Sequence, residues 1–450
     1  MMLLKNAMIL LEGDEKTGLV DILCDDKIRG IAGNISAEAD EVIDLEGMLL
    51  IPGCIDSHVH FNDPGFPHRE NFRSGTTAAA WGGITTIIDM PCTSIPAVTS
   101  VSALNTKLAA ISNKAVVDYA LWGGICSTDL GRIPESLNSL HQAGVIGFKI
   151  YTVSSMKSFP ELSYEQIADI LQKHRTYLYA FHAEDREIIE KATSSLSDIQ
   201  KRSPEYYVKS RPAAAEITAV TNILEILTPQ NRVHFVHISC GASARKIIKY
   251  RRNSDISFET CPHYLEFTAV DLPLLKGRIK TAPPVKSRED RNFLRSCVGK
   301  GDVDFITTDH AGCDYQQEKE KDDFRQVYSG IPGIELMVMY LFSEFYLQKK
   351  TSLKTMINLT SERAARRYGL YPRKGSLLPG TDADFTVIDL KKPYLVEENR
   401  LHSLGKYSPF QGNLFKCSID RTILRGKTVY SSQKGIQVQP GYGIWIKPAQ

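Results

Sequence analysis

Two different patterns of apolar and polar positions occur in this 450-residue chain, one near its ends and one in its middle. Near both ends, short apolar runs are interrupted by turn signals such as Gly47 and Gly426, a pattern that predicts short strands. In the middle, compact apolar runs alternate with segments of helical period, which is typical of parallel strands joined by crossover helices. The strands expected near the two ends lie at residues 8–11, 19–24, 27–31, 41–44, 383–389, 421–424 and 427–430.

The middle of the chain offers eight candidate strands, most of them separated by helical segments. One helix is predicted after Ser163, where a capping box with Gln166 precedes apolar residues at helical spacing. A second helix is expected to begin at Ser210 and to carry Ile217 and Val220 on its apolar face. The eight candidate strands lie at residues 53–60, 84–90, 115–122, 145–151, 177–182, 233–239, 255–260 and 304–309.

Eight such alternations over about 260 residues match the size of a (β/α)8 barrel. We therefore predict an α/β protein with a TIM-type barrel over residues 51–374. The β-rich ends, residues 1–50 and 375–450, are expected to form one small composite β-sandwich domain. An open doubly wound sheet would give the same alternation, because a sequence pattern does not show whether a sheet closes.

Composition narrows the class of protein. Lys+Arg 54 and Asp+Glu 52 leave a net charge of +2, and 42% of the residues are hydrophobic. This balance excludes a disordered chain and offers no excess positive charge for nucleic acid or an anionic membrane. No apolar run reaches the roughly 18–20 residues of a membrane span. Nine dispersed cysteines without a CxxC pair are typical of reduced, buried thiols, so we expect a cytoplasmic protein.

Residue types that bind metals recur where the predicted central strands end, which is where barrel enzymes carry their active sites. His58 and His60 are two apart on a strand, so both imidazoles project to one side and can bind one ion of a zinc-like metal. His182 and His237 end two later strands and would each bind a second ion through one ring nitrogen. Taken singly, each histidine could instead be a satisfied polar side chain at a strand end.

Lys149 lies on an otherwise apolar strand, where a buried ammonium is costly unless it is paired or neutralised. Addition of CO2 to the neutral amine would give a carbamate whose two oxygens can bridge two cations. An ion pair with Asp309 or Glu184 is the alternative. Asp309 ends the eighth predicted strand, where it would ligate one ion and take the proton of a metal-bound water, whose pKa falls to about 7. Its alternative role is a helix N-cap.

Eight motifs occur in order along nearly the whole chain: residues 56–65 (DSHVHFNDPG), 75–80 (GTTAAA), 82–86 (GGITT), 147–149 (GFK), 182–184 (HAE), 259–265 (ETCPHYL), 282–285 (APPV) and 407–410 (YSPF). They resemble the amidohydrolase superfamily, specifically its cyclic-amide branch of dihydroorotases, allantoinases and hydantoinases. The resemblance implies a distorted (β/α)8 barrel with a composite β-sandwich, and homodimers or homotetramers. It also implies two Zn2+ or other divalent ions bridged by N6-carboxylysine at Lys149. The implied metal ligands are His58, His60, Lys149, His182, His237 and Asp309.

The reaction implied by the resemblance is zinc-dependent hydrolysis of a small cyclic amide. A hydroxide that bridges the metal pair attacks the ring carbonyl, and Asp309, the catalytic residue, passes the proton to the leaving nitrogen. Dihydroorotases carry Arg after the HxH motif and Asn after Met-Pro, and both residues hold the substrate carboxylate. Asn62 and Cys92 occupy these positions here, which disfavours dihydroorotate.

We therefore expect the substrate to be a five-membered ureido ring such as allantoin or a hydantoin. The expected substrate contacts are Asn62, Cys92, Ser154 and Ala282, with Ser154 a candidate for stabilising an oxyanion. Dihydroorotase stays the first alternative, followed by a non-catalytic hydantoinase-like scaffold protein and a mononuclear deaminase. The charged run at residues 318–323 is expected to be a solvated loop, with a lid formed by residues 314–324 as the alternative.

Overall fold

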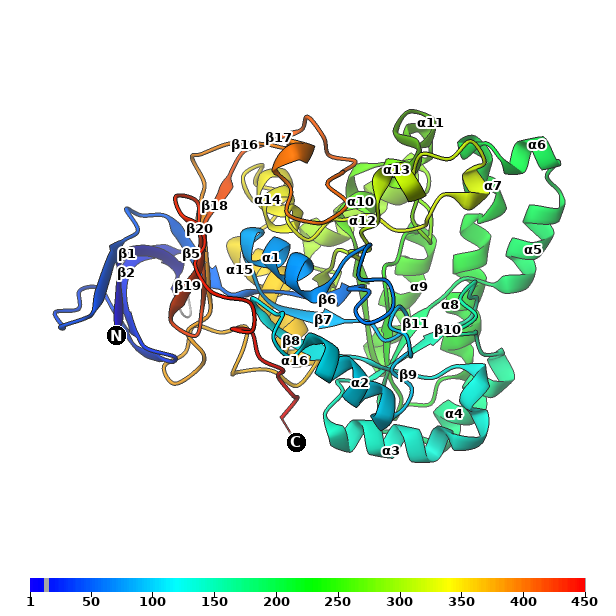
Figure 1. The fold of residues 1–450 in the computed structure, drawn as a ribbon, viewed down its shortest axis with the longest axis horizontal. Helices are drawn as coiled ribbons and strands as arrows, with labels where there is room; N and C mark the ends of the chain where they lie inside the picture. The colour runs from blue at the N-terminus through cyan, green and yellow to red at the C-terminus, as the bar shows by residue number, and fades with distance from the viewer. Residues whose placement is uncertain (12–15, 450) are drawn as a thin grey trace.

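Strands from the two ends of the chain form one sheet, on the left of Figure 1. The computed structural model describes residues 1–11 and 16–449. In this part of the chain the sheet has nine strands in the order β20-β19-β18-β15-β5-β1-β2-β3, with β4 beside β1. Their bounds are β1 (Met2–Leu10), β2 (Thr17–Cys24), β3 (Ile28–Ala32), β4 (Glu41–Asp44), β5 (Leu49–Pro52), β15 (Phe385–Asp389), β18 (Ser418–Leu424), β19 (Lys427–Ser431) and β20 (Gly435–Ile436).

The burial pattern of its strands explains this terminal sheet. In β1, Leu4, Ala7 and Ile9 are buried in an apolar core, with a shift of register between Leu4 and Ala7. Because neighbouring residues of a strand point to opposite faces, such spacing gives the sheet one apolar face. β5 is buried along its whole length since β1 and β15 flank it. Residue 50, where the sequence pattern placed a domain boundary, therefore lies inside a strand of this sheet.

The central strands are parallel and form two linked sheets, β6-β7-β8 and β9-β10-β11-β12-β13-β14. The chain passes from β8 to β9 through Trp122. At the other ends of the two sheets, Val59 and His310 form a parallel bridge, and the His60 amide donates to the His310 carbonyl at 2.7 Å. The strands therefore surround a core, as predicted for a barrel. Their bounds are β6 (Cys54–Val59), β7 (Ile84–Asp89), β8 (Asp118–Leu121), β9 (Gly123–Gly124), β10 (Phe148–Tyr151), β11 (Leu178–His182), β12 (Arg232–Phe235), β13 (Asp255–Thr260) and β14 (Phe305–Ile306).

Helices cover the outside of the barrel (Figure 1). α4 begins at the predicted capping box, in which Ser163 and Gln166 bond reciprocally. α8 begins at Ala213 and not at Ser210, because Pro212 disfavours a helical conformation in the residue before it. The longer helices are α1 (Phe72–Trp81), α2 (Val101–Ile111), α3 (Ile133–Ala143), α4 (Tyr164–Lys173), α5 (Arg186–Ser194), α8 (Ala213–Ile226), α9 (Gly241–Tyr250) and α12 (Arg288–Lys300).

The remaining helices and strands are short, and most of them lie between β11 and β12, after β13 or in the C-terminal third of the chain. The short helices are α6 (Asp198–Lys201), α7 (Pro204–Ser210), α10 (Pro262–Glu266), α11 (Leu272–Leu275), α13 (Tyr315–Glu318), α14 (Met337–Leu341), α15 (Leu353–Ile357) and α16 (Arg363–Arg367). A small two-stranded sheet pairs β16 (Tyr394–Leu395) with β17 (Leu414–Phe415). No helix in the described residues combines the length and the apolarity needed to cross a lipid bilayer.

Most central strands are shorter than predicted, and for β12 and β14 this changes where a candidate ligand lies. β12 ends at Phe235 and β14 at Ile306, so His237 and Asp309 lie in the loops that follow and do not end strands. Both residues have positive φ, 40° and 50°, a conformation that is uncommon for residues other than glycine. Strained backbone of this kind persists where surrounding contacts impose it, and it clusters at functional sites.

A buried ionic cluster joins the barrel to the terminal sheet. Lys374 Nζ lies 2.7 Å from a carboxylate oxygen of Asp118 in β8, and 2.9 and 2.6 Å from those of Asp382 and Asp384, which precede β15. Arg425 also pairs with Asp118. Each buried carboxylate therefore meets a cation, which compensates for the cost of removing these charges from water.

The C-terminal tail also reaches the barrel. The Ile446 amide donates to the Tyr119 carbonyl at 2.8 Å, and the Tyr119 amide donates to the Ile444 carbonyl at 3.0 Å. The segment that begins in the terminal sheet thus passes beside β8. The two parts of the molecule are held together by backbone hydrogen bonds as well as by buried ion pairs.

Candidate metal centre and substrate cavity

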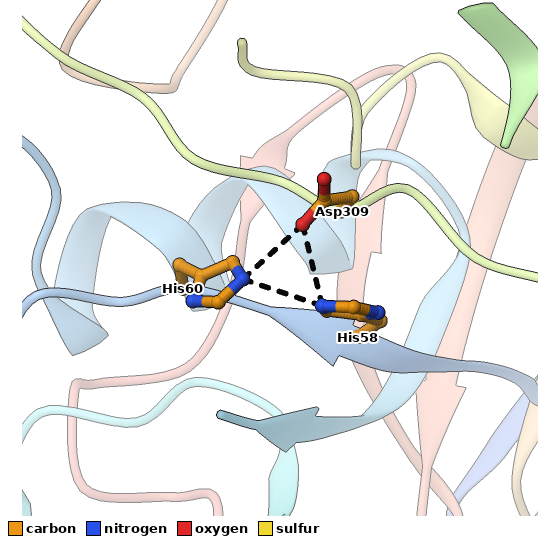
Figure 2. Close-up of side chains that lie close together, drawn as sticks. All are labelled: His58, His60 and Asp309. Atoms are coloured by element: carbon orange, nitrogen blue, oxygen red, sulfur yellow. Dashed lines mark hydrogen bonds and ion pairs between the residues drawn. The ribbon is translucent and has the colours of Figure 1, made fainter. Parts of the chain in front are cut away.

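Three candidate ligands converge where β6 ends (Figure 2). His58 Nε2 and His60 Nε2 lie 3.3 Å apart, and Asp309 Oδ1 lies 3.3 Å from His58 Nε2 and 3.1 Å from His60 Nε2. Two nitrogens bound at about 2.0–2.1 Å to one tetrahedral zinc ion lie about 3.3 Å apart. The three donor atoms therefore have the spacing that a single divalent ion requires.

A second pair of imidazoles lies beside the first. His182 Nδ1 and His237 Nε2 are 3.0 Å apart, and the ring centroids of His58 and His237 are 5.2 Å apart. Both residues are buried. The structure thus brings into one polar cluster two histidines on the strands β6 and β11 and two that lie just beyond the ends of β6 and β12.

Lys149 is the fifth member of the cluster and the most informative one. Its side chain is fully buried, and its Nζ has no hydrogen-bond partner among the described residues. Burial lowers the pKa of Lys149 to about 8, although Cys92, Glu259 and Asp309 raise it. The alternative of an ion pair with Asp309 or Glu184 is not what the structure has.

An unpaired buried amine is costly, so its presence calls for a chemical explanation. A neutral amine can add CO2, and the resulting carbamate is an anion that balances bound cations. The donor chemistry around Lys149, which consists of imidazoles and a carboxylate, suits zinc and related divalent metals. These residues therefore fit a metal centre bridged by a carboxylated lysine.

Two buried glutamates orient the candidate ligands: Glu259, for which the sequence predicted no role, and Glu184, which was expected only as a possible ion-pair partner of Lys149. Glu259 lies 2.5 Å from His58 Nδ1 and 3.0 Å from His234 Nε2. Glu184 lies 3.1 Å from His182 Nε2 and pairs with Arg211. A carboxylate on the far nitrogen of a metal-binding histidine fixes its tautomer and ring orientation. Burial raises the pKa of Glu259, but its histidine partners outweigh burial and hold that pKa well below its usual range.

The loop that carries Asp309 is fixed from both sides. Asp56, two residues before the HxH motif, accepts from the Thr308 amide at 3.1 Å and also contacts the Thr308 hydroxyl. On the other side, His310 Nε2 lies 3.1 Å from Glu70. These contacts impose the positive φ of Asp309 and aim its carboxylate at the imidazoles.

A cavity of about 730 Å³ opens over the cluster. His60, His182, His237 and Asp309 form part of its wall, and so do all four expected substrate contacts: Asn62, Cys92, Ser154 and Ala282. Asn62 Oδ1 is buried and has no partner among the described residues. Cys92 differs from the other three, because its Sγ lies beside His60 and Tyr151.

Residues 325–329 form another part of the wall, and two buried lysines hold the segment 324–329 that contains them. Lys280 Nζ donates to two backbone carbonyls of this segment at 2.6 Å each, and Lys319 Nζ donates to one at 2.7 Å. Lys319 belongs to the charged run 318–323, for which the sequence predicted a solvated loop. That prediction is wrong for Lys319, because its ammonium satisfies backbone carbonyls inside the protein.

A second cluster of ligand-type residues is not a candidate metal centre. Asp118, Asp382 and Asp384 bring their carboxylates as close together as the ligands of an ion would be. The ammonium of Lys374 lies among them. The charge that a metal would supply is therefore already provided by the protein.

The chain matches the model of the amidohydrolase family over residues 49–429. The allantoinase of Rubrobacter xylanophilus is 34% identical over 433 residues, which cover 95% of this chain and 93% of that protein. The allantoinase of Enterococcus faecalis is 30% identical, with 99% of both chains covered. The solved structure of L-hydantoinase (dihydropyrimidinase) from Arthrobacter aurescens has a TM-score of 0.93 and 28% identity, with 99% of both chains covered.

The chain therefore belongs to the amidohydrolase family, and its resemblance to the cyclic-amide branch is confirmed. This family depends on bound metal. In the described residues, the group that fits that requirement is formed by His58, His60 and Asp309, with the neighbouring histidines and Lys149.

Proposed function

We propose that this protein is a metal-dependent hydrolase that opens a five-membered ureido ring, such as allantoin or a hydantoin, at a carbon–nitrogen bond. One observation carries the proposal: the buried amine of Lys149 has no partner, although histidines and Asp309 surround it. Similarity to allantoinases and hydantoinases over almost the full length of the chain supports the reaction class.

The residues that would hold the metal fall into two groups. His58, His60 and Asp309 would hold one Zn2+, and His182 and His237 a second, with N6-carboxylysine at Lys149 shared between them. When bound, the metal pair supplies positive charge that polarises a carbonyl and acidifies water. The carboxylates of Glu259 and Glu184 keep His58 and His182 in the tautomers that such binding needs.

Asp309 is the proposed catalytic residue. Burial raises the pKa of the Asp309 carboxyl, but His58 and His60 outweigh it and lower this pKa to about 2. The carboxylate is therefore ionised at neutral pH and can accept a proton. It would take a proton from the water that attacks the ring carbonyl and deliver it to the leaving ring nitrogen, so that a carboxylate and a new N–H replace the amide bond.

The charges of the cavity support an uncharged ring. Its three arginines are already paired with carboxylates, Arg69 with Glu318, Arg211 with Glu184 and Arg325 with Asp323, and its other cation, Lys157, is exposed to solvent. A substrate carboxylate would have to compete for these partners, whereas a ring N–H can donate to the free Oδ1 of Asn62. Allantoin and hydantoins have such N–H groups and no ring carboxylate, which ranks them above dihydroorotate, the second candidate.

A turnover panel tests the proposal. Zinc-loaded protein is assayed with allantoin, 5-substituted hydantoins, dihydropyrimidines and dihydroorotate, and its metal content is measured by atomic emission. We expect about two metal ions per chain and the highest kcat/KM for allantoin or a hydantoin. A chain that takes up no divalent metal would instead favour the scaffold alternative, and preferential turnover of dihydroorotate would overturn the substrate ranking.

Three further proposals concern organisation. Residues 1–50 with 375–450 are proposed as one composite domain and 51–374 as another, because the terminal strands share a sheet. The chain is proposed to form a homodimer or homotetramer, which light scattering tests. It is proposed to work in the cytoplasm, since all nine cysteines are buried free thiols.

A further inference from the structure

His58, His182 and His60 differ in the group that contacts the ring nitrogen facing away from the proposed metal centre. His58 and His182 each have a glutamate carboxylate on the nitrogen that faces away from the cluster. His60 uses Nε2 toward Asp309, and the partner of its Nδ1 is Cys92 Sγ at 3.7 Å. A thiol therefore stands where the other two imidazoles have a carboxylate.

Cys92 is in turn bonded to Tyr151. Its Sγ lies 3.2 Å from the Tyr151 hydroxyl, and both side chains are buried. Tyr151 reaches the other half of the cluster, because its ring stacks on His182 at a centroid distance of 4.8 Å and an interplanar angle of 19°. Lys149 Nζ lies 5.1 Å from the centre of the same ring. The Cys92–Tyr151 pair thus connects His60 with His182 and Lys149.

We propose that Cys92 and Tyr151 are positioning residues that hold the His60 imidazole in its ligand tautomer and fix its distance from His182. The inference rests on the proposed metal centre. An imidazole that binds through Nε2 carries its proton on Nδ1, and that N–H donates to the Cys92 sulfur. The second bond of the sulfur, to the Tyr151 hydroxyl, fixes the position of the sulfur.

Sulfur is a weaker acceptor than a carboxylate, so His60 is the least firmly oriented of the three imidazoles. Its release sets the rate at which the ion it shares with His58 and Asp309 leaves the protein. This role differs from the substrate contact expected of Cys92 from sequence, because the sulfur is aimed at a ligand and at Tyr151.

The test compares Cys92→Ala, Cys92→Ser and Tyr151→Phe with the wild type, each reconstituted with cobalt(II). The readouts are the rate of metal loss to a chelator and the visible absorption of the bound cobalt. Removal of such a partner typically weakens metal binding by about 10–100-fold. We expect Cys92→Ala to release metal about tenfold faster with a shifted spectrum, and Cys92→Ser, which keeps an acceptor, to restore most of the difference. Tyr151→Phe keeps the stacked ring and should show a smaller change in the same direction.

Cys313→Ala is the matched control. Cys313 is also buried, and its Sγ lies 3.3 Å from the Tyr407 hydroxyl, but its hydrogen-bond partner is not an imidazole. Metal release from this variant should match the wild type. Equal acceleration in Cys92→Ala and Cys313→Ala would show that only packing is involved and would overturn the inference.

A second result would also overturn it: a raised KM in Cys92→Ala with unchanged metal release, which is the signature of a substrate contact. Failure of the proposed function looks different, because wild-type protein would then bind no cobalt. The direct metal content of the wild type therefore separates the two failures.

Discussion

Two buried lysines of this protein show how differently similar clusters of charged residues can be balanced. Lys374 lies among three carboxylates at 2.6–2.9 Å, in the junction between the terminal sheet and the barrel. Lys149 lies among imidazoles at the carboxyl ends of the barrel strands, and its Nζ has no partner. Both side chains are almost completely removed from water.

The difference lies in which charges are already compensated. In the Lys374 cluster the protein supplies its own cation, so every buried carboxylate is satisfied and the cluster stabilises the junction. In the Lys149 cluster the ligand atoms face one another at 3.0–3.3 Å, and the Lys149 amine beside them has no hydrogen-bond partner among the described residues. Proximity of ligand-type residues is therefore not enough to identify a metal centre. The useful signal is an imbalance of charge that a metal, together with a modified lysine, would remove.

The largest effect is expected from Asp309→Asn. The amide cannot accept the proton that the carboxylate accepts, so kcat should fall by about 10³-fold. Metal content should be partly retained, because His58 and His60 stay in place. Steady-state kinetics and atomic emission on the same preparation check this. Near-normal kcat would remove Asp309 from the chemistry.

Lys374→Met is expected to damage stability and not catalysis. The substitution leaves three buried carboxylates without their shared cation, which should cost about 3–5 kcal/mol of unfolding free energy. Urea denaturation measures it, with metal content of the folded fraction as a second readout. Lys173→Met is the control, since the Lys173–Asp169 pair is exposed and its loss should cost less than about 1 kcal/mol. An equal loss of unfolding free energy in both variants would show that the buried Lys374 cluster stabilises the protein no more than an exposed ion pair.

Glu259→Gln tests whether the Glu259 carboxylate orients the His58 imidazole for metal binding. The neutral amide orients the imidazole less firmly, so metal affinity should fall by about 10–100-fold. Competition with a chromogenic chelator reports the change. Glu266→Gln serves as the control, because Glu266 pairs with Arg295 away from the ligands and should leave the affinity unchanged. An unaltered affinity in Glu259→Gln would mean that Glu259 does not orient His58 for metal binding.

Lys149→Met is expected to change the unfolding free energy in the opposite direction from Lys374→Met. Methionine has a similar volume and no charge, so it removes an unpaired buried ammonium and should stabilise the metal-free protein by about 1–2 kcal/mol. Turnover should be lost, because the bridging group is gone. Urea denaturation of metal-free samples gives the first quantity. Destabilisation as large as that of Lys374→Met would show that Lys149 is compensated in the metal-free protein.

The smallest effect concerns acid stability through Asp382. Burial raises the pKa of Asp382, but Lys374 and Lys27 lower it to about 2, below its ordinary value of 3.8. A depressed carboxyl pKa stabilises the fold above the unfolded-state value, and this contribution disappears as the pH falls toward 2. The stability gap between wild type and Asp382→Asn should thus be constant above pH 5 and narrow between about pH 4 and 2. A gap independent of pH over that range would contradict this.

Local elements of the fold could be predicted because their signals are local. The capping box at Ser163 and Gln166 and the apolar face that follows it define α4 without help from the rest of the chain. Register and strand ends depend on neighbours, and there the pattern failed. It extended the strands that precede His237 and Asp309, because the apolar residues near these positions also suit a buried loop.

The supporting residues of the site could not be predicted for a different reason. Glu259 and His58 are separated by 201 residues in the chain, and nothing near either one indicates their contact. The alternation of Ser257 and Glu259 along β13 was a signal that both polar side chains face inward. It does not say which imidazole they meet.

The sequence by itself determined the alternation of strands and helices, the candidate ligand types and the family motifs, since each is written in residue type and short-range spacing. Tertiary structure alone decided which buried charges are compensated, because compensation depends on distances between atoms from separate strands. In the chain, Lys149 lies on an apolar strand and Lys374 lies between Arg373 and Gly375, and neither neighbourhood shows which carboxylates the lysine meets. The packing of the barrel against the terminal sheet gave Lys374 its three carboxylates, whereas the interior of the barrel left the Lys149 amine without a hydrogen-bond partner.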